Sequence, residues 1–235
     1  MHSLTSHGFT IRNRDFESTI AVRRNDITDD RLGVFKPAFA EMGRLARHHP
    51  EELIFGLLSS GFTASCFDGQ PFLDAEHPVK KSDGTTELIS NMQDGSGPAW
   101  YLLDTSRAVR PLIFQEREPY VFEAMTEPTN PHVFTNAEFL YGMRARVNVG
   151  FALWQLGFGS KASLDVPSYS AARAAMMGYR ADGGRKLGIK PTVLVVPPEL
   201  EENALALVNA ANNAAGATNV WTGTARLIVT RFLDI

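Results

Sequence analysis

The chain has a single cysteine, no run of like charges and no long apolar segment, and each absence excludes a class of protein. With Cys66 alone, no internal disulfide can form, which excludes a disulfide-stapled fold. Lys and Arg number 23 against 26 Asp and Glu, so composition gives no support for a basic nucleic-acid-binding face. The densest apolar stretch, residues 147–158, is broken by Gly150 and Gly157. It is too short to cross a membrane, and we expect a soluble protein.

Motifs that carry chemistry are also missing. Gly183 is followed by Gly184 and Arg185, whereas a phosphate-binding loop needs Lys and then Ser or Thr after its second glycine. No Gly-x-Ser-x-Gly nucleophile elbow occurs. The adjacent His48 and His49 would point about 100° apart on a helix and could not converge on one metal ion. These patterns favour a protein without a catalytic site.

One group of residues keeps an enzyme hypothesis open. Cys66, Asp68 and His77 lie close in sequence, with Glu76 beside them, and their side chains could hold a metal ion or activate a thiol. Their spacing matches no zinc motif, so an ordinary loop with a hydrogen-bonded histidine is the simpler interpretation. The alternative function is therefore a hydrolase or metal-dependent enzyme that uses Cys66, Asp68 and His77. It requires the three side chains to converge in a pocket.

Two further patterns have a chemical and a structural interpretation. Asp104 and Ser106 could be joined with His77 into a triad, but local bonds between side chain and backbone explain the first two residues more simply. The aromatic run between Phe139 and Phe158 could stack on bases. Few basic residues accompany that run, so a sheet core and an interface are favoured over a nucleic-acid-binding sheet.

Alternation and helical spacing predict a chain of mixed α and β structure. A period of two on either side of Asn13-Arg14-Asp15 predicts a β-hairpin over residues 8–24. Apolar residues at helical spacing predict a long helix over residues 32–60, which either kinks or restarts at Pro50. Residues 62–99 are rich in turn signals and predict a flexible surface excursion. The remaining predictions are strands at 100–103, 112–115 and 120–125, two long strands meeting near 148–150 within 139–158, a helix at 167–177 closed by Gly183-Gly184, a buried strand at 192–196, a helix from Pro198 to Ala211, and a last strand at 226–232.

Several long strings of the sequence resemble one protein family. They are WYLLDTSRAVRPLIFQER at 100–117, VGFALWQ at 149–155 and LGIKPTVLVVPPELE at 187–201. Shorter strings occur in the same order at 29–33, 51–55, 66–70, 76–78 and 141–142. The chain is similar, over nearly its whole length, to the Mu-like prophage major head subunit family, the T protein of phage Mu and its relatives. Relatives carry some tens of residues before the point that matches Ser6, including an N-terminal arm, and we expect that arm to be absent here.

The resemblance implies an α+β fold of the Hong-Kong-97-like phage capsid type, with residues 1–235 as a single capsid-protein unit. Residues 8–30 are then the E-loop hairpin, residues 31–61 the spine helix region, and residues 62–235 the remaining peripheral and axial domain segments. The implied function is that of a structural subunit of an icosahedral head, with no enzyme activity and no cofactor. Implied partners are other copies in rings and shells, and possible scaffold, protease and portal proteins. The shell would assemble in the cytoplasm of the bacterial host and enclose DNA without sequence-specific binding. The protein would then be located in the virion capsid and would have no membrane partner.

Four charged residues next to the expected hairpin are candidates for a subunit interface. Arg23 and Arg24 end its second arm, and Asp29 and Asp30 follow shortly after. We expect the two arginines to face the two aspartates of a neighbouring copy and to set the register between subunits. One exposed ion pair contributes only about 0–1 kcal/mol, but in a shell it repeats at every copy. Asp29 or Asp30 could also cap the long helix.

Overall fold

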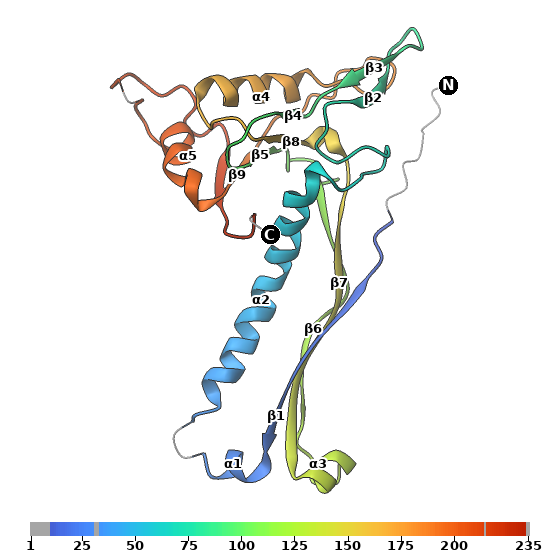
Figure 1. Cartoon of the computed structure of the whole chain (residues 1–235), viewed down its shortest axis with the longest axis vertical. Coiled ribbons are helices and arrows are strands. Elements are labelled where there is room, and N and C mark those ends of the chain that lie inside the picture. Colours follow the sequence, from blue (N-terminus) through green and yellow to red (C-terminus); the bar gives the residue numbers. More distant parts are fainter. Residues whose placement is uncertain (1–9, 31–32, 214, 234–235) are drawn as a thin grey trace. The chain divides into compact units, whose positions relative to one another are not determined.

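The computed structural model describes residues 10–30, 33–213 and 215–233. Contacts divide the chain into two units (Figure 1). The first unit is built mainly from Ile54–Ile113 and from the described part of the chain after Gly150. The second unit is built from Ile11–Leu53 and Phe114–Val149. Each unit therefore combines segments that are far apart in sequence. No helix among the described residues combines the length and the apolar character that a membrane span requires.

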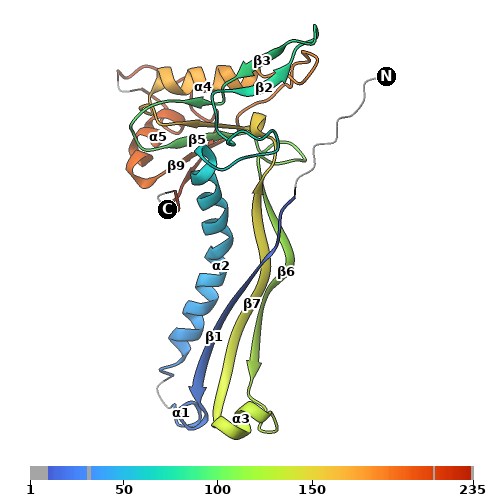
Figure 2. The ribbon, with the colours of Figure 1, turned by 45° about the vertical axis from the view of Figure 1, so that its right-hand side comes forward.

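The second unit contains a three-stranded sheet in the order β1-β7-β6, formed by β1 (Arg14–Arg23), β7 (Glu138–Phe151) and β6 (Leu112–Met125). Figure 2 shows the three long strands side by side. β1 runs antiparallel to β7, with Arg14 opposite Val147 and Arg23 opposite Glu138. Two short helices, α1 (Arg24–Thr28) and α3 (Pro131–Asn136), follow the ends of β1 and β6. Pro119 lies in β6, and an edge strand tolerates a proline because its outer N–H groups have no ladder partner.

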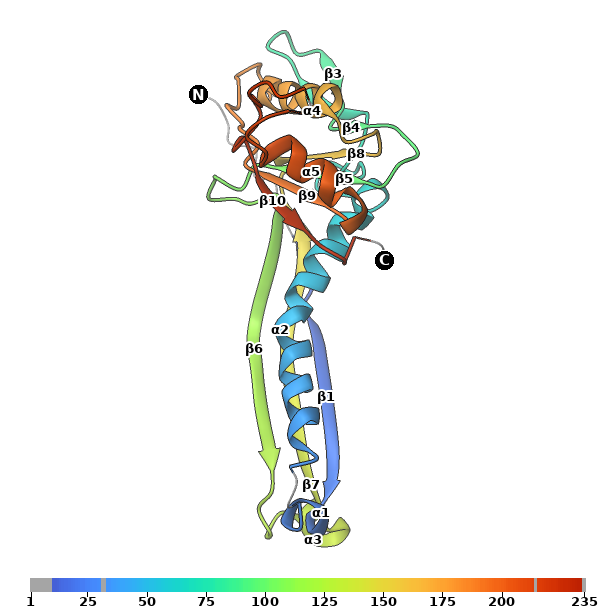
Figure 3. The same ribbon diagram turned by 90° about the vertical axis from the view of Figure 1, so that its left-hand side faces the viewer.

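Helix α2 (Lys36–Ser59) is a single helix of 24 residues with Pro50 inside it. At about 1.5 Å per residue, it is about 36 Å long. Its first part packs on one face of the three-stranded sheet (Figure 3), where the rings of Phe39 and Tyr141 lie 4.6 Å apart and those of His49 and Phe16 lie 4.2 Å apart. The predicted long helix is therefore confirmed, and it continues through Pro50. The helix begins at Lys36, later than predicted, because Val34 and Phe35 form a turn before it; residues 31 and 32 lie outside the described part of the chain.

The first unit contains a five-stranded sheet in the order β10-β9-β5-β8-β4. β9 is parallel to β10 and β4 is parallel to β8, whereas β5 is antiparallel to both of its neighbours. Two helices accompany the sheet: α4 contacts β8, and α5 contacts β9 and β10. The bounds are β4 (Met92–Gln93), β5 (Trp100–Leu103), β8 (Gly157–Ser160), β9 (Val193–Val196), β10 (Arg226–Val229), α4 (Val166–Gly178) and α5 (Glu201–Val208), with a hairpin of β2 (His77–Lys80) and β3 (Thr86–Ile89) and 3-10 turns at Ser60–Phe62, Trp154–Leu156 and Pro198–Leu200.

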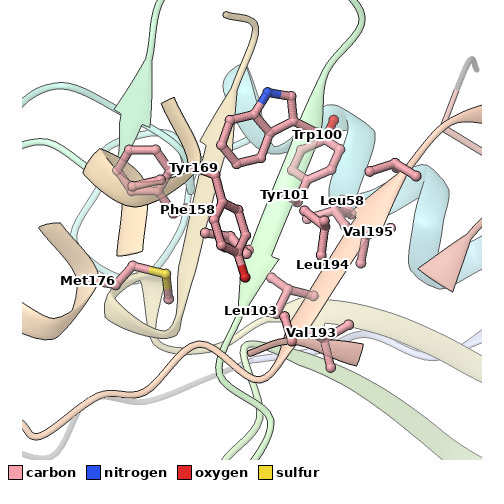
Figure 4. Close-up of a cluster of buried hydrophobic side chains, with 14 of the residues drawn as sticks. Leu58, Trp100, Tyr101, Leu103, Phe158, Tyr169, Met176, Val193, Leu194 and Val195 are labelled. Carbon is pink, nitrogen blue, oxygen red and sulfur yellow. The ribbon is translucent and has the colours of Figure 1, made fainter. Parts of the chain in front are cut away.

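The core of the first unit lies around the three central strands of this sheet. Every residue of β5, β8 and β9 is buried, as expected for strands covered on both faces. Figure 4 shows Trp100 and Tyr101 of β5 among side chains of β8, β9 and α4. The indole N–H of Trp100 donates to the carbonyl oxygen of Ala162 at 2.8 Å, so its polar atom is satisfied. The predicted strands at 100–103 and 192–196 and the helix at 167–177 are confirmed within one or two residues.

The hairpin predicted over residues 8–24 is wrong for the described residues. Arg14 and Asp15 lie inside β1, and β1 pairs with β7 instead of with the residues before it. The side chain of Gln115 donates to the Oδ1 atom of Asn13 at 2.6 Å, which holds the predicted turn extended beside β6. Residues 8 and 9 lie outside the described part of the chain. Alternation identified a strand correctly, but it carries no information about the partner strand.

Two other predictions were wrong. Residues 62–99 are not a surface excursion, because they include Phe72 and His77, each fully buried, and the β2–β3 hairpin. The segment 139–158 does not consist of two strands meeting near 148–150. β7 runs unbroken from Glu138 to Phe151, and β8 follows only after a 3-10 turn. Helix α4 also ends at Gly178, before Gly183-Gly184, and α5 ends at Val208.

Candidate functional site

The four predicted interface residues lie where β1 turns into α1, within the second unit. Arg23 is the last residue of β1, and the backbone N–H of Arg24 donates to the carbonyl oxygen of Ala137 at 2.8 Å. Arg23, Arg24 and Asp29 are exposed, whereas Asp30 is half-buried. Within the described chain, no ion pair with an N–O distance of 4.0 Å or less involves Arg23 or Arg24. The local backbone therefore fixes the positions of both arginines and leaves their charges facing solvent.

Asp30 has an internal role that the other three residues lack. Its Oδ1 atom accepts a hydrogen bond from the backbone N–H of Val34 at 2.9 Å, and its Oδ2 atom accepts one from Phe35 at 3.4 Å. These N–H groups come just before α2, so the carboxylate organises the approach to the helix. Both bonds end on the turn before α2, and neither reaches a residue of the helix, so Asp30 does not take the predicted capping role. Asp29 instead follows α1, where its backbone N–H donates to the carbonyl oxygen of Asn25.

Cys66, Asp68 and His77 do converge, in the first unit. The thiol of Cys66 donates to the Oδ1 atom of Asp68 at 3.0 Å, and the Nδ1 atom of His77 lies 2.7 Å from the Oδ2 atom of the same carboxylate. The thiol sulfur, one carboxylate oxygen and one imidazole nitrogen of these residues lie within 4.8 Å of one another, a spacing that could accommodate a metal ion. Glu76 is exposed and does not join the cluster. The sequence therefore identified the correct three residues as neighbours.

Asn91 orients the imidazole ring of His77. Its amide nitrogen donates to the carbonyl oxygen of Phe72 at 2.8 Å, and its Oδ1 atom accepts from the backbone N–H of Asp74 at 2.8 Å, so the orientation of the amide is fixed. The same oxygen lies 3.2 Å from Nε2 of His77, which must therefore carry a proton. The ring also stacks on Trp154, with centroids 4.0 Å apart. Both ring nitrogens of His77 are thus engaged by Asp68 and Asn91.

The environment of Cys66 disfavours a reactive thiolate. Burial, followed by the hydrogen bond to Asp68, raises the pKa of the Cys66 thiol to about 12. A protonated thiol is a poor nucleophile and a poor metal ligand. With His77 fully buried and bonded at both nitrogens, the geometry is that of a hydrogen-bonded core cluster.

The other chemical candidates resolve into local structure. Asp104 accepts hydrogen bonds from the backbone N–H and the hydroxyl of Ser106, at 2.9 and 2.6 Å, as the local interpretation predicted. Burial opposes ionisation of Asp104, but these bonds, the bond from the backbone N–H of Lys190 and the nearby charge of Arg107 hold its pKa below the usual value. In the second unit, His48 lies near Glu51, whereas Nδ1 of His49 bonds the hydroxyl of Tyr120 at 2.5 Å. The two histidines therefore have different partners.

The sequence matches, over residues 1–233, the family described as the Mu-like prophage major head subunit gpT. The chain belongs to this head subunit family. It is 43% identical to the major capsid protein of Escherichia phage Mu over 242 residues, covering 99% of this chain and 79% of that protein. It is 39% identical over 213 residues to the Mu-like prophage FluMu major head subunit of Haemophilus influenzae, covering 88% and 69%.

Solved capsids of bacteriophage JBD30 have the same fold as this head subunit. The procapsid chain is 43% identical, with a TM-score of 0.80, and the match covers 94% of this chain and 75% of that one. The chain from the capsid decorated with minor capsid protein trimers is 30% identical, with a TM-score of 0.83, covering 100% and 79%. The predicted α+β fold of the Hong-Kong-97-like capsid type is thus confirmed, as is the function of a major capsid protein that assembles with other copies into a phage shell.

Sequence reasoning missed the residues that hold the cluster of this head subunit together. Asn91 is fully buried and donates to three backbone carbonyl groups, those of Phe72, Trp154 and Gly157. An asparagine in a turn-rich segment is ordinarily a surface residue, and nothing local distinguishes Asn91 from one. The only signal available was its position between Ile89 and Met92, two apolar residues.

Proposed function

We propose that the second unit serves as the peripheral part of the head subunit, with residues 31–61 as the spine helix region. The length of α2 and its packing against the three-stranded sheet support this assignment. Residues 8–30 would act as the E-loop segment, with β7 supplying the strand that pairs with β1, and residues 62–235 would supply the remaining peripheral and axial segments. On this proposal, the chain acts as one capsid-protein unit over residues 1–235.

Arg23 and Arg24 are proposed to contact Asp29, and to a smaller extent Asp30, of a neighbouring copy. The observation that carries this proposal is that both arginines are exposed and form no ion pair within the described chain. Two other arginines of the same unit do have acidic partners: Arg146 lies 3.5 Å from Asp15, and Arg144 lies 3.8 Å from Glu118. Asp30 contributes less because it accepts the backbone N–H groups of Val34 and Phe35.

The experiment is a charge swap scored by particle yield in electron microscopy and sedimentation. The double variant Arg23→Glu and Arg24→Glu should reduce the yield at least several-fold without lowering the melting temperature of the free subunit. Adding Asp29→Arg to the same chain should restore part of the yield. Arg117→Glu is the matched control, because Arg117 is exposed on β6 and has no ion pair in the described chain. Unchanged yield in the double variant, or an equal loss in the control, would contradict the proposed contact.

The cluster of Cys66, Asp68 and His77 is proposed to be structural, and the chain to have no enzyme activity. The protonated thiol and the enclosed imidazole support this assignment over a hydrolase or a metal-dependent enzyme. Titration with Zn²⁺ followed by calorimetry should show no stoichiometric binding. Binding of one ion per chain that is lost in His77→Ala, with the fold retained, would support the metal alternative.

The wider partners of the head subunit follow from its shell function. Scaffold, protease and portal proteins are proposed partners during assembly in the cytoplasm of the bacterial host, and trimers of a minor capsid protein are a proposed partner on the finished shell. The shell is proposed to enclose DNA without sequence-specific binding, in keeping with a net charge of −3. A mobility-shift assay at physiological salt should show no preference among duplex sequences, and a reproducible preference would count against this proposal.

A further inference from the structure

Helix α3 presents one phenylalanine to solvent. Within this short helix Val133 is 2% exposed, whereas Phe134 is 84% exposed. Both ends of the helix are fixed: the side chain of Asn130 accepts from the backbone N–H of His132 at 3.0 Å, and Ala137 ends the helix with a left-handed φ of 52°. The position of Phe134 is therefore set by capped local structure. A large apolar ring held out in this way has the properties of an interface anchor.

The second unit also contains a mainly apolar cavity of about 250 Å³ between α2 and the sheet, with Glu17, Ser18, His49, Glu52 and Tyr120 also in its lining. Met42, Leu45 and Ala46 of α2 line one side, and Phe16 of β1 and Met143 of β7 line the other. A smaller apolar cavity, of about 150 Å³, is large enough to bind benzene. Methionine sulfur also makes favourable contacts with aromatic rings. The cavity thus has the volume and the lining to accept a phenyl ring.

The Phe134 side chain cannot fill the cavity of its own chain. Glu138 begins β7 and Met143 lies five residues further along that strand, a separation of about 17 Å at about 3.3 Å per residue. Phe134 precedes Glu138, and a phenylalanine side chain is much shorter than this distance. The ring of Phe134 can therefore occupy such a cavity only in another chain.

We propose that Phe134 of one copy inserts into the cavity between Met42 and Met143 of a neighbouring copy. Phe134 and the cavity lie on different parts of the same unit, so the contact between two copies is heterologous. Such a contact can propagate from copy to copy, as ring and shell formation requires. Membership of the head subunit family supplies the second copy, because such chains assemble with others of their kind. The inference goes beyond the charged contact of Arg23 and Arg24, since it joins other residues and an apolar surface.

Disulfide trapping between two different chains tests this contact. Phe134→Cys and Leu45→Cys are made in separate chains of different tag length, each carrying Cys66→Ser to remove the native thiol. Leu45 is 56% exposed at the cavity, so a cysteine there can be reached. After mixing, assembly and mild oxidation, a heterodimer should form in at least fivefold excess over the Leu45→Cys and Val220→Cys control pair. Val220 is 76% exposed but lies in the first unit, away from α3 in sequence.

A second variant checks the contact without cysteine. Phe134→Ser should lower particle yield at least about tenfold while leaving the melting temperature unchanged, because its ring has few contacts in the free chain. Phe134→Leu should retain part of the yield. A heterodimer yield no greater than that of the control pair, or full assembly of Phe134→Ser, would overturn the proposal. Particle formation by the unmodified chain is measured in parallel. If the cysteine variants also form particles but show no cross-link, this contact is refuted and the shell function stands.

Discussion

Replacing Asn91 with leucine would test whether the buried cluster stabilises the first unit. Leucine has nearly the same shape as asparagine but neither donates nor accepts hydrogen bonds. Three groups would lose a bond of 3.2 Å or less: the carbonyl oxygen of Phe72, the backbone N–H of Asp74 and the Nε2–H of His77. The carbonyl oxygens of Trp154 and Gly157 would lose longer bonds of 3.3 Å. Each unsatisfied buried polar group costs about 1–3 kcal/mol. Because bonds within one network are not additive, we expect Asn91→Leu to lower the free energy of unfolding by about 3–6 kcal/mol.

The assay is urea unfolding followed by tryptophan fluorescence. Trp100, Trp154 and Trp221 are the only tryptophans, and all three lie in the first unit, so the signal reports that unit alone. A loss of about 3–6 kcal/mol is a large part of the 5–15 kcal/mol typical of a folded domain, and the transition should move to clearly lower urea. Asn212→Leu is the matched control, since Asn212 is exposed in the same unit, and it should change stability by no more than about 0.5 kcal/mol. A loss below about 1 kcal/mol in Asn91→Leu would refute the assigned role of the network.

Two further predictions concern the same unit. A Cβ atom at Gly95 would lie 2.1 Å from the carbonyl oxygen of Lys161, so Gly95→Ala should lower the free energy of unfolding in urea by about 1–3 kcal/mol. The control Gly178→Ala, whose Cβ atom meets no atom within 4 Å, should be neutral or slightly stabilising. Equal effects of the two substitutions would contradict the steric argument. Since the pKa of Cys66 is raised to about 12 from 9.0, the native thiolate fraction at pH 8 is about 1000-fold lower than in the unfolded chain, and alkylation by iodoacetamide should be slow until urea unfolds the protein. The native state keeps this proton to higher pH, so the stabilisation is complete below pH 9 and is lost as the pH rises from 9 towards 12; fast alkylation of the native protein at pH 8 would argue against this environment.

Local sequence pattern determined the elements whose formation depends on near neighbours. Apolar residues spaced three and four apart define the face of α2 in the sequence itself, and the run of valines and leucine at 193–196 marks a strand buried on both faces. The long strings shared with the head subunit family, such as residues 100–117, similarly indicate the capsid fold and function from the sequence alone. Both kinds of information are contained in contiguous residues.

Tertiary structure alone decided which distant segments meet. The alternation in residues 14–23 predicted a strand, but its pairing with β7 depends on residues more than a hundred positions away. The closeness of Cys66, Asp68 and His77 in sequence suggested a site, whereas the bonds from Asn91 and the stacking of Trp154 made it a closed core cluster. Helical periodicity is a property of residues a few positions apart, while strand pairing and burial of a polar hub depend on contacts between residues far apart in the chain. The sequence therefore determined the elements and the family, and the packing of the folded chain determined the partner of each strand and the role of each buried polar residue.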